Sequence, residues 1–295
     1  MAQAQTGTMA STLVATAREE KARRITPFDV IVYLLLIFFA LIALGPFIFS
    51  FLSSFKTLEH VLDFPPSLIP NPWTWANYQV ILSNSLFLRW LLNSAIFAAA
   101  TVVLNALFSA MAGYALSRLR FPGRDTIFLL TLAVMMVPLP IIVLPKFLIA
   151  YNMHITNSML GLILPYMVQP ISVFLMVQNL KSLPRELEEA AMIDGASRWR
   201  IFFQIVLPLV KPALTAVAIL SFMGSWNEFF WSLLTLNSQD QLTLPIGLSF
   251  FKGAHYTEYN LLLAGSMFNT IPVLIVFFIF QRYFIEGIAS AGLKG

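Results

Sequence analysis

One carboxylate stands out in the apolar second half of the chain. Glu228, preceded by Trp226 and Asn227, lies inside a hydrophobic run that extends from Val206 to Leu236. A carboxylate is costly in hydrocarbon and usually faces a water-filled path or a polar partner. Two interpretations follow. In one, the Trp226-Asn227-Glu228 step breaks a helix where it lines a translocation pathway. In the other, Glu228 lies nearer the membrane surface and hydrogen-bonds a neighbouring helix.

The other residue types that carry chemistry are scattered. The three histidines, His60, His154 and His255, are far apart, and none stands at metal-ligand spacing from a carboxylate, so we interpret them as loop residues. The patterns GxSxG, HExxH and Walker A do not occur, and there is no cysteine. We therefore predict no catalytic residue, no metal site and no cofactor bound by this chain. Asn93 and Asn105, inside another apolar run, are expected to serve packing and hydrogen bonding between helices rather than to contact a substrate.

Composition defines the broad class. Of 295 residues, 58% are hydrophobic and 11% are charged, and the mean hydropathy is +0.79. About a quarter of the residues of a soluble domain are charged, so this chain is predicted to be an all-α, polytopic integral membrane protein. The formal net charge of +4 comes from basic residues beside apolar runs. That position is typical of charges that orient a membrane protein, and we expect no binding to nucleic acid.

Six apolar runs are long enough to cross about 30 Å of hydrocarbon. They are Val30–Leu52, Trp90–Ser117, Thr126–Ile149, Met159–Leu180, Val206–Leu236 and Leu261–Phe284. We predict a six-span transmembrane domain over residues 29–284, between a disordered tail of residues 1–28 and a second tail of residues 285–295. The first run exceeds the ~7–15 residues of a signal-peptide core, so it is interpreted as a retained span. The fifth is interrupted at Gly224–Glu228, where we expect a kink or bend.

Lysine and arginine are unevenly divided between the loops on the two sides. The side with both termini and the loop of residues 181–205 collects most of them, which places these parts in the cytoplasm. The two larger loops on the opposite side are Ser53–Arg89 and Asn237–Asn260. The first has proline turns followed by Trp73 and Trp75, which suits a loop that returns along the membrane surface.

The loop of residues 181–205 is predicted to be a helix, a sharp turn and a second helix. Acidic residues near Glu189 suit the positive end of the first helix, and Gly195 can end it in the left-handed conformation. The second helix can begin at Ser197. Its apolar residues recur at i, i+3, i+4 and i+7 and form one face: Trp199, Phe202, Phe203 and Val206. Such a slim turn could enter a cleft in a partner protein or could simply link two spans.

The same loop resembles the EAA loop of bacterial ABC importer permeases. The matching residues are Glu189, Ala190, Ala191, Asp194, Gly195, Ile205, Leu207 and Pro208. The segment Trp226–Phe229 and the tail from Gln281 are similar to the carbohydrate-type, maltose-transporter MalG-like subfamily. One difference is Ala289–Leu293, where that subfamily often has a run of the type Thr-Ala-Gly-Ala-Val.

The resemblance implies a fold and a set of partners. The fold would be that of the MetI-like, type I ABC importer permeases, in the bacterial inner membrane. A second, unlike permease subunit, two copies of an ABC ATPase and an extracytoplasmic solute-binding protein would complete the assembly. ATP and Mg would be bound by the ATPase, which the helix at Glu189 would contact as a coupling helix. Gly287, Gly292 and Lys294 of the C-terminal tail would reach the ATPase, and Asn237–Asn260 would contact the binding protein.

The cargo stays open at this point. A sugar or oligosaccharide is the expectation from the resemblance, and glycerol phosphate, a polyol or another polar solute is the alternative. A sugar phosphate would favour basic groups facing the pathway, for which Lys146 is the one candidate. A hypothesis of a different class is a proton-coupled secondary transporter that uses Glu228. A membrane-embedded enzyme would need a clustered catalytic set, which the sequence lacks.

Overall fold

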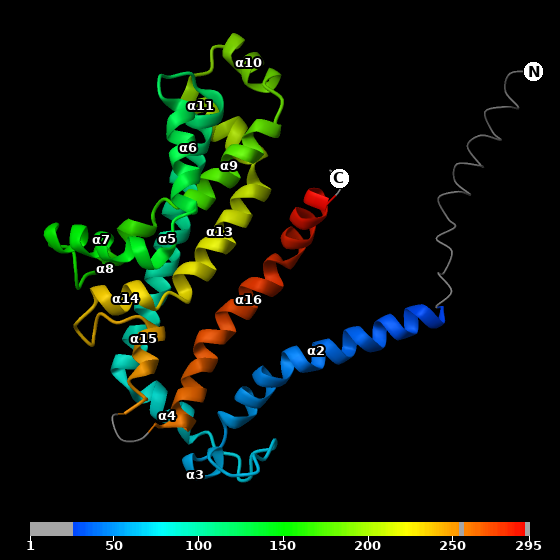
Figure 1. Ribbon diagram of the computed structural model, residues 1–295, viewed down its shortest axis with the longest axis vertical. Coiled ribbons are helices and arrows are strands. Elements are labelled where there is room, and N and C mark those ends of the chain that lie inside the picture. Colours follow the sequence, from blue (N-terminus) through cyan, green and yellow to red (C-terminus); the bar gives the residue numbers. More distant parts are fainter. Residues whose placement is uncertain (1–25, 254–256, 293–295) are drawn as a thin grey trace, which may run out of the picture. The chain divides into compact units, whose positions relative to one another are not determined.

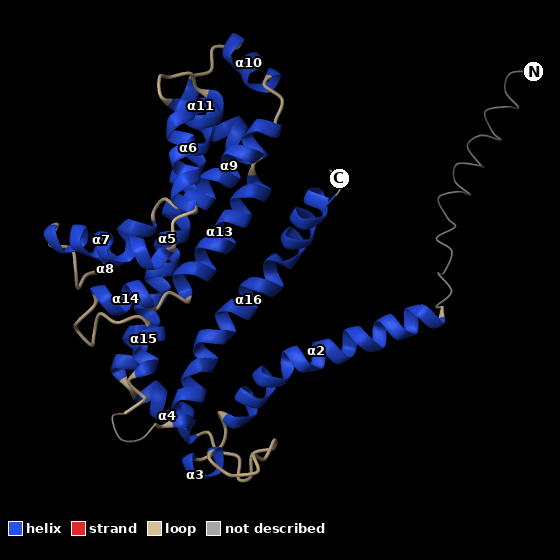
Figure 2. Ribbon diagram, in the orientation of Figure 1, coloured by secondary structure: helices blue, strands red, loops and turns tan. Residues whose placement is uncertain are grey.

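The computed structural model describes residues 26–253 and 257–292, where the chain forms helices and loops without a strand (Figures 1 and 2). The all-α class is confirmed. The predicted tail up to residue 25, His255 and Lys294 lie outside the described residues. The helices, in chain order, are α2 (Pro27–Ser53), α3 (Leu58–Val61), α4 (Ala76–Ser83), α5 (Ser85–Arg118), α6 (Arg124–Met135), α7 (Leu139–Asn152), α8 (Met159–Ile163), η1 (Leu164–Tyr166), α9 (Pro170–Ser182), α10 (Glu186–Ile193), α11 (Arg198–Ile201), η2 (Phe202–Val206), α12 (Leu207–Leu209), α13 (Lys211–Trp226), α14 (Phe230–Thr235), α15 (Leu244–Ser249) and α16 (Tyr259–Gly292).

Four segments are long and apolar enough to cross a membrane: α2, α5, the α8-to-α9 segment and most of α16. Two further candidates are bent pairs. The first joins α6 to α7 with a bend of 112°, and the second joins the segment Arg198–Leu209 to α13 with a bend of 78°. The described residues therefore hold four to six candidate spans, and six is reached only if each bent pair crosses as one.

Prolines account for the bend in the third predicted span. We expected one run from Thr126 to Ile149, but α6 ends at Met135 and α7 begins at Leu139. Pro138 lies in the gap, and Pro140 follows in the first turn of α7. Proline lacks the backbone N–H of a helix interior and disfavours helical geometry in the residue before it. The run is therefore two helices with different directions.

Most of helix α2, up to Ser50, belongs to the first of two compact units. It begins at a reciprocal cap. The Thr26 backbone N–H donates to the Asp29 carboxylate at 2.9 Å, and the Asp29 N–H donates to the Thr26 hydroxyl at 3.2 Å. This pattern satisfies two backbone donors that a helix start leaves free. Beyond Asp29 the helix has no charged residue, as expected for a span.

The second unit, from Phe51 onward, is built around α5, which packs against both α9 and α13. Figure 1 shows these three helices side by side. The fully buried Asn105 of α5 lies between them, and its amide donates to Ser172 on α9 at 2.8 Å and to Ser221 on α13 at 2.6 Å. The expectation that Asn105 hydrogen-bonds between helices is confirmed. Because lipid provides little hydrophobic drive between helices, such contacts and close packing hold them together.

A glycine sets the distance between α5 and α9. A Cβ atom added at Gly113 would lie 2.6 Å from the Cβ of Met176, closer than real Cβ atoms approach. The absence of a side chain therefore allows the two backbones to come together, as small residues do in membrane helix packing.

Candidate functional site

The segment from α10 to α11 folds as predicted into a helix, a turn and a second helix. Gly195 has a φ of +81°, and a Cβ built there would meet nothing within 4 Å, so its backbone conformation is what requires glycine. The Ser197 hydroxyl accepts the Arg200 N–H at 3.3 Å and caps α11. Local signals in the sequence were sufficient for this motif.

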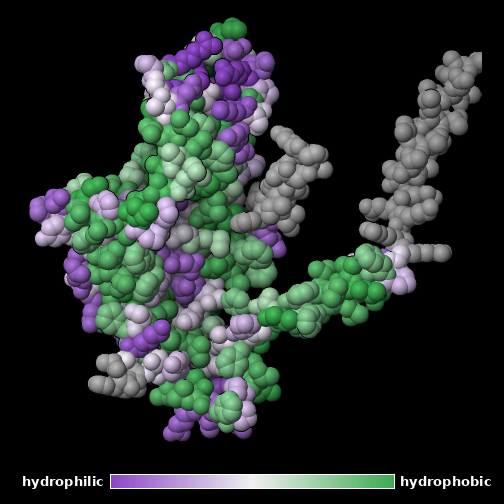
Figure 3. Space-filling view, in the orientation of Figure 1, coloured by the Kyte–Doolittle hydropathy of each residue, from purple (hydrophilic) through white to green (hydrophobic). Residues whose placement is uncertain are grey.

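This turn projects from one end of the second unit. Figure 3 shows hydrophilic side chains gathered there, over α10 and its neighbours. Glu189, Ala190, Asp194 and Gly195 are exposed, and Ala191 is buried against the body of the protein. Exposed apolar side chains lie among them: Leu187, Met192 and Ile193, the last 87% exposed. The turn therefore presents small, acidic and apolar groups outward, which is a surface suited to a partner protein.

The apolar face predicted for the second helix is present, but this chain covers only half of it. Phe202 and Val206 are buried, and the Phe202 ring packs 5.4 Å from the ring of Tyr114 on α5. Trp199 and Phe203 are 62% and 47% exposed, and their rings stack on each other at 6.1 Å. These two exposed rings are therefore available to pack against another surface.

The remaining residues that match the EAA loop lie at the bend into α13. Ile205 lies in η2, a π-helical turn, and Leu207 and Pro208 lie in α12. A π-turn inserts one residue into the helical ladder, and proline cannot donate to it. Together they weaken the ladder just before the 78° bend.

Two residues of this region were missed by sequence reasoning. Arg118, the last residue of α5, places its Nε 2.7 Å from Oε1 of Glu188 on α10, and the side chains are only 4% and 8% exposed. Glu188 looked like an ordinary acidic residue of a helix start. No local pattern pairs it with an arginine 70 residues earlier.

The predicted break at Trp226-Asn227-Glu228 is confirmed, because α13 ends at Trp226. The Glu228 carboxylate accepts the backbone N–H of Trp231 at 2.7 Å and both the N–H and the hydroxyl of Ser232 at 2.8 Å. It thereby caps the start of α14, where an acidic group is favoured. These partners lie three and four residues further along the chain, in the helix that follows the break.

Trp226 and Asn227 join α13 to α16. The Trp226 ring is buried, and its indole N–H donates to the carbonyl of Asn269 at 2.9 Å. Asn227 is exposed, and its amide oxygen accepts from the Asn269 side chain at 3.3 Å. Asn269, a polar residue within an apolar run, was not singled out from the sequence. Among the three predicted pathway residues, Asn227 has the most accessible side chain.

A second charge lies beside Glu228. The ammonium of Lys146, from α7, lies 4.0 Å from the ring centre of Trp231 and 4.4 Å from that of Tyr166. Trp231 is also the residue whose backbone N–H the Glu228 carboxylate accepts, so the two charged groups share it as a neighbour. Two aromatic faces and a carboxylate thus compensate the cation. The lysine considered as a phosphate-binding group is engaged within the protein.

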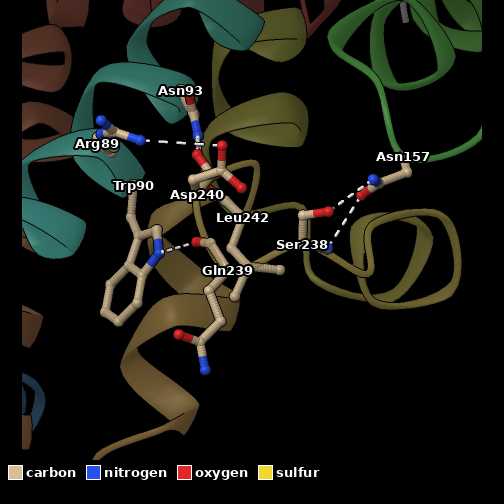
Figure 4. Close-up of polar contacts among 8 residues, drawn as sticks. All are labelled: Arg89, Trp90, Asn93, Asn157, Ser238, Gln239, Asp240 and Leu242. Carbon is tan, nitrogen blue, oxygen red and sulfur yellow. Dashed lines mark hydrogen bonds and ion pairs between the residues drawn. The ribbon is translucent and has the colours of Figure 1, made fainter.

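The loop of residues 236–243 is held from two sides (Figure 4). From α5, the Trp90 indole N–H donates to the Gln239 carbonyl at 2.6 Å, and the Asn93 amide donates to two further loop carbonyls at 2.9 Å. On the other side, the Asn157 amide oxygen accepts two loop N–H groups at 3.0 Å. The expectation that Asn93 bonds between helices is wrong, since its partners lie in a loop.

The C-terminal candidates are only partly described. Gly287 and Gly292 lie in the last turns of α16, which stays helical to Gly292. Within the described residues, no group of three or more His, Asp or Glu side chains is arranged to hold a metal ion.

The helices, their apolar surfaces and the projecting turn define a polytopic membrane protein. The chain belongs to the binding-protein-dependent transport system inner membrane component family, which matches residues 103–290. It is therefore a multi-pass protein of the inner membrane, and the family expected from the sequence is confirmed.

Relatives of this chain are transport permeases. It is 39% identical over 259 residues to the arabinooligosaccharides transport system permease protein AraQ of Bacillus subtilis, a match that covers 87% of this chain and 92% of AraQ. It is 34% identical over 264 residues to the trehalose/maltose transport system permease protein MalG of Thermococcus litoralis, covering 88% and 94%. A chain of a bacterial ABC transporter that imports the acidic polysaccharide alginate superposes with a TM-score of 0.79 and 26% identity, covering 89% and 98%.

Proposed function

We propose that this protein is a permease subunit of an ATP-driven, binding-protein-dependent importer for a sugar or oligosaccharide. Membership of the family and the transport roles stated in the names of AraQ and MalG support this proposal. A second permease subunit, a pair of ABC ATPase subunits and a solute-binding protein complete the importer. ATP and Mg are bound by the ATPase, outside this chain.

The observation that carries the proposal is the exposed turn at the end of α10. Glu189, Ala190, Asp194 and Gly195 lie on its outer surface, so they are free to contact another protein. Ile193 adds an apolar side chain that has no neighbour to cover it fully. In this proposal the turn is a coupling helix that enters a groove of the ATPase. The Lys and Arg distribution supports a cytoplasmic position for the turn and for both termini.

The contacts of Lys146 favour a neutral cargo over a sugar phosphate. An anionic solute needs cations that can turn toward it. The Lys146 charge is compensated by Glu228 and two aromatic rings. The Glu228 carboxylate in turn caps the start of α14. This role is structural and gives no support to proton transport by Glu228. Asn227, exposed at the end of α13, is the proposed pathway residue.

Reconstitution tests the proposal directly. The chain would be co-expressed with its partner permease and an ABC ATPase. The complex would then be placed in liposomes together with the solute-binding protein of the same importer and supplied with ATP. Labelled arabinotriose, maltose and an alginate trisaccharide serve as neutral and anionic probes. We expect ATP-dependent uptake of a neutral probe and none of the anionic one. Uptake driven by a proton gradient without ATP would contradict the proposal.

A further inference from the structure

The Arg118–Glu188 ion pair attaches α10 to the transmembrane core. Only two side chains of the helix, Glu188 and Ala191, are buried. Glu188 is the charged one of these, and a buried carboxylate is costly unless it is paired and hydrogen-bonded. Its partners come from α5, a helix that contributes the centre of the core.

The pair is part of a small network that fixes both sides. The Tyr114 hydroxyl donates to the second oxygen of Glu188 at 3.2 Å. The Arg118 guanidinium also donates to the carbonyl of Leu183 at 2.8 Å, just before α10 begins. Arg185, at the start of α10, donates back to the carbonyl of Ser117 at 3.5 Å. The end of α5 and the start of α10 are therefore joined at several points in both directions.

Along the chain, α10 is joined backward through Leu183–Arg185 to α9, which itself packs on α5, and forward to α13. The forward route is the weaker one. It passes through the Gly195 turn, the π-turn η2 and the bend at Pro208 before it reaches α13. Each of these interrupts the regular helical ladder. A displacement of α10 is thus passed on more directly through Glu188 to α5 than along the chain to α13.

We propose that Arg118, Glu188 and Tyr114 are positioning residues that transmit movement of α10 to α5 during transport, an inference that rests on the proposed function. The side chains of this network orient the turn, and because they are buried they do not themselves contact the ATPase. Its loss should leave the ATPase bound and hydrolysing ATP, while transport per ATP falls.

The test uses the reconstituted importer and four variants. Glu188→Gln and Arg118→Met each break the pair, and the double variant removes both partners. Glu186→Gln changes an exposed carboxylate in the same helical turn and is the matched control. Three quantities are measured: co-purified ATPase, basal ATP hydrolysis, and sugar taken up per ATP hydrolysed.

We expect Glu188→Gln and Arg118→Met each to lower uptake per ATP at least about fivefold, within the usual range of coupling between sites. The double variant should be no worse than either single variant, because all three lose the same contact. Additive losses, or a Glu188→Gln variant that matches Glu186→Gln, would overturn the inference.

If the single variants fail to assemble, Tyr114→Phe provides a milder test, because it removes one hydroxyl and leaves no charge without a partner. It should still lower uptake per ATP about twofold or more, and an unchanged ratio would again overturn the inference. Failure of the unaltered chain to support ATP-dependent uptake would instead reject the proposed function.

Discussion

Replacing Asn105 by leucine should remove the polar centre that joins α5, α9 and α13. The Asn105 amide makes four hydrogen bonds, two donated and two accepted. The partners are Ser172 Oγ (2.8 Å), Ser221 Oγ (2.6 Å), Ser109 Oγ (2.9 Å) and the backbone N–H of Gln169 (2.9 Å). A hydrogen bond between side chains inside a membrane protein contributes about 0.6 kcal/mol on average. Four such bonds give about 2–3 kcal/mol, which is the expected loss in the free energy of unfolding.

The residue Asn179 provides a matched control. It is exposed on α9, and its amide donates only to the Leu175 carbonyl of its own helix, at 3.0 Å. Both leucine variants would be unfolded by denaturant in detergent micelles and compared with the unaltered protein. Asn179→Leu should stay within about 0.5 kcal/mol of it, as surface changes usually do. Equal losses for the two variants would refute the view that the Asn105 network holds the three helices together.

Three further predictions concern single positions. Gly113→Ala should cost about 1–3 kcal/mol of stability, because its Cβ would overlap Met176, whereas Gly224→Ala meets nothing within 4 Å and should be tolerated; thermal denaturation distinguishes them. Gly195→Val should reduce ATPase co-purification and uptake and Gly195→Asn should retain both, because asparagine tolerates a positive φ and a β-branched residue does not. Glu228→Gln should keep ATP-dependent uptake and cost about 1 kcal/mol of stability through a weaker cap of α14; abolished uptake in a stably folded variant would favour a direct role for the carboxylate in transport.

The features that could be predicted from the sequence are those with local causes. Hydrophobic runs of sufficient length indicated the membrane segments, since the thickness of the bilayer sets their length. Gly195 indicated a left-handed turn, and the polar step at Asn227 indicated the end of α13. The prolines at 138 and 140 lie where α6 gives way to α7, inside the run that was predicted as one span.

The contacts that could not be predicted join segments far apart in the chain. Glu188 and Arg118 are 70 residues apart, and the Lys146 ammonium meets a ring from α14. Such partners depend on how helices pack, which no periodicity within one segment reveals. Asn93 shows the same limit, since its place in an apolar run suggested a helix partner and its hydrogen bonds go to a loop.

These distant contacts form two networks within the second unit. Asn105 links α5 to both α9 and α13 at the centre of the core, and Arg118 links the end of the same helix to α10. Helix α5 therefore belongs to both networks. A force applied at α10 would reach Asn105 along one uninterrupted helix of 34 residues, whereas the route through Pro208 crosses a 78° bend. Since a continuous helix transmits displacement better than a bent one, α5 should move with α10 and carry α9 and α13 along as a rigid group. Spin labels on α5 and α9 should then keep their separation through an ATP cycle of the reconstituted importer, and a changing separation would show that the three helices do not move as one.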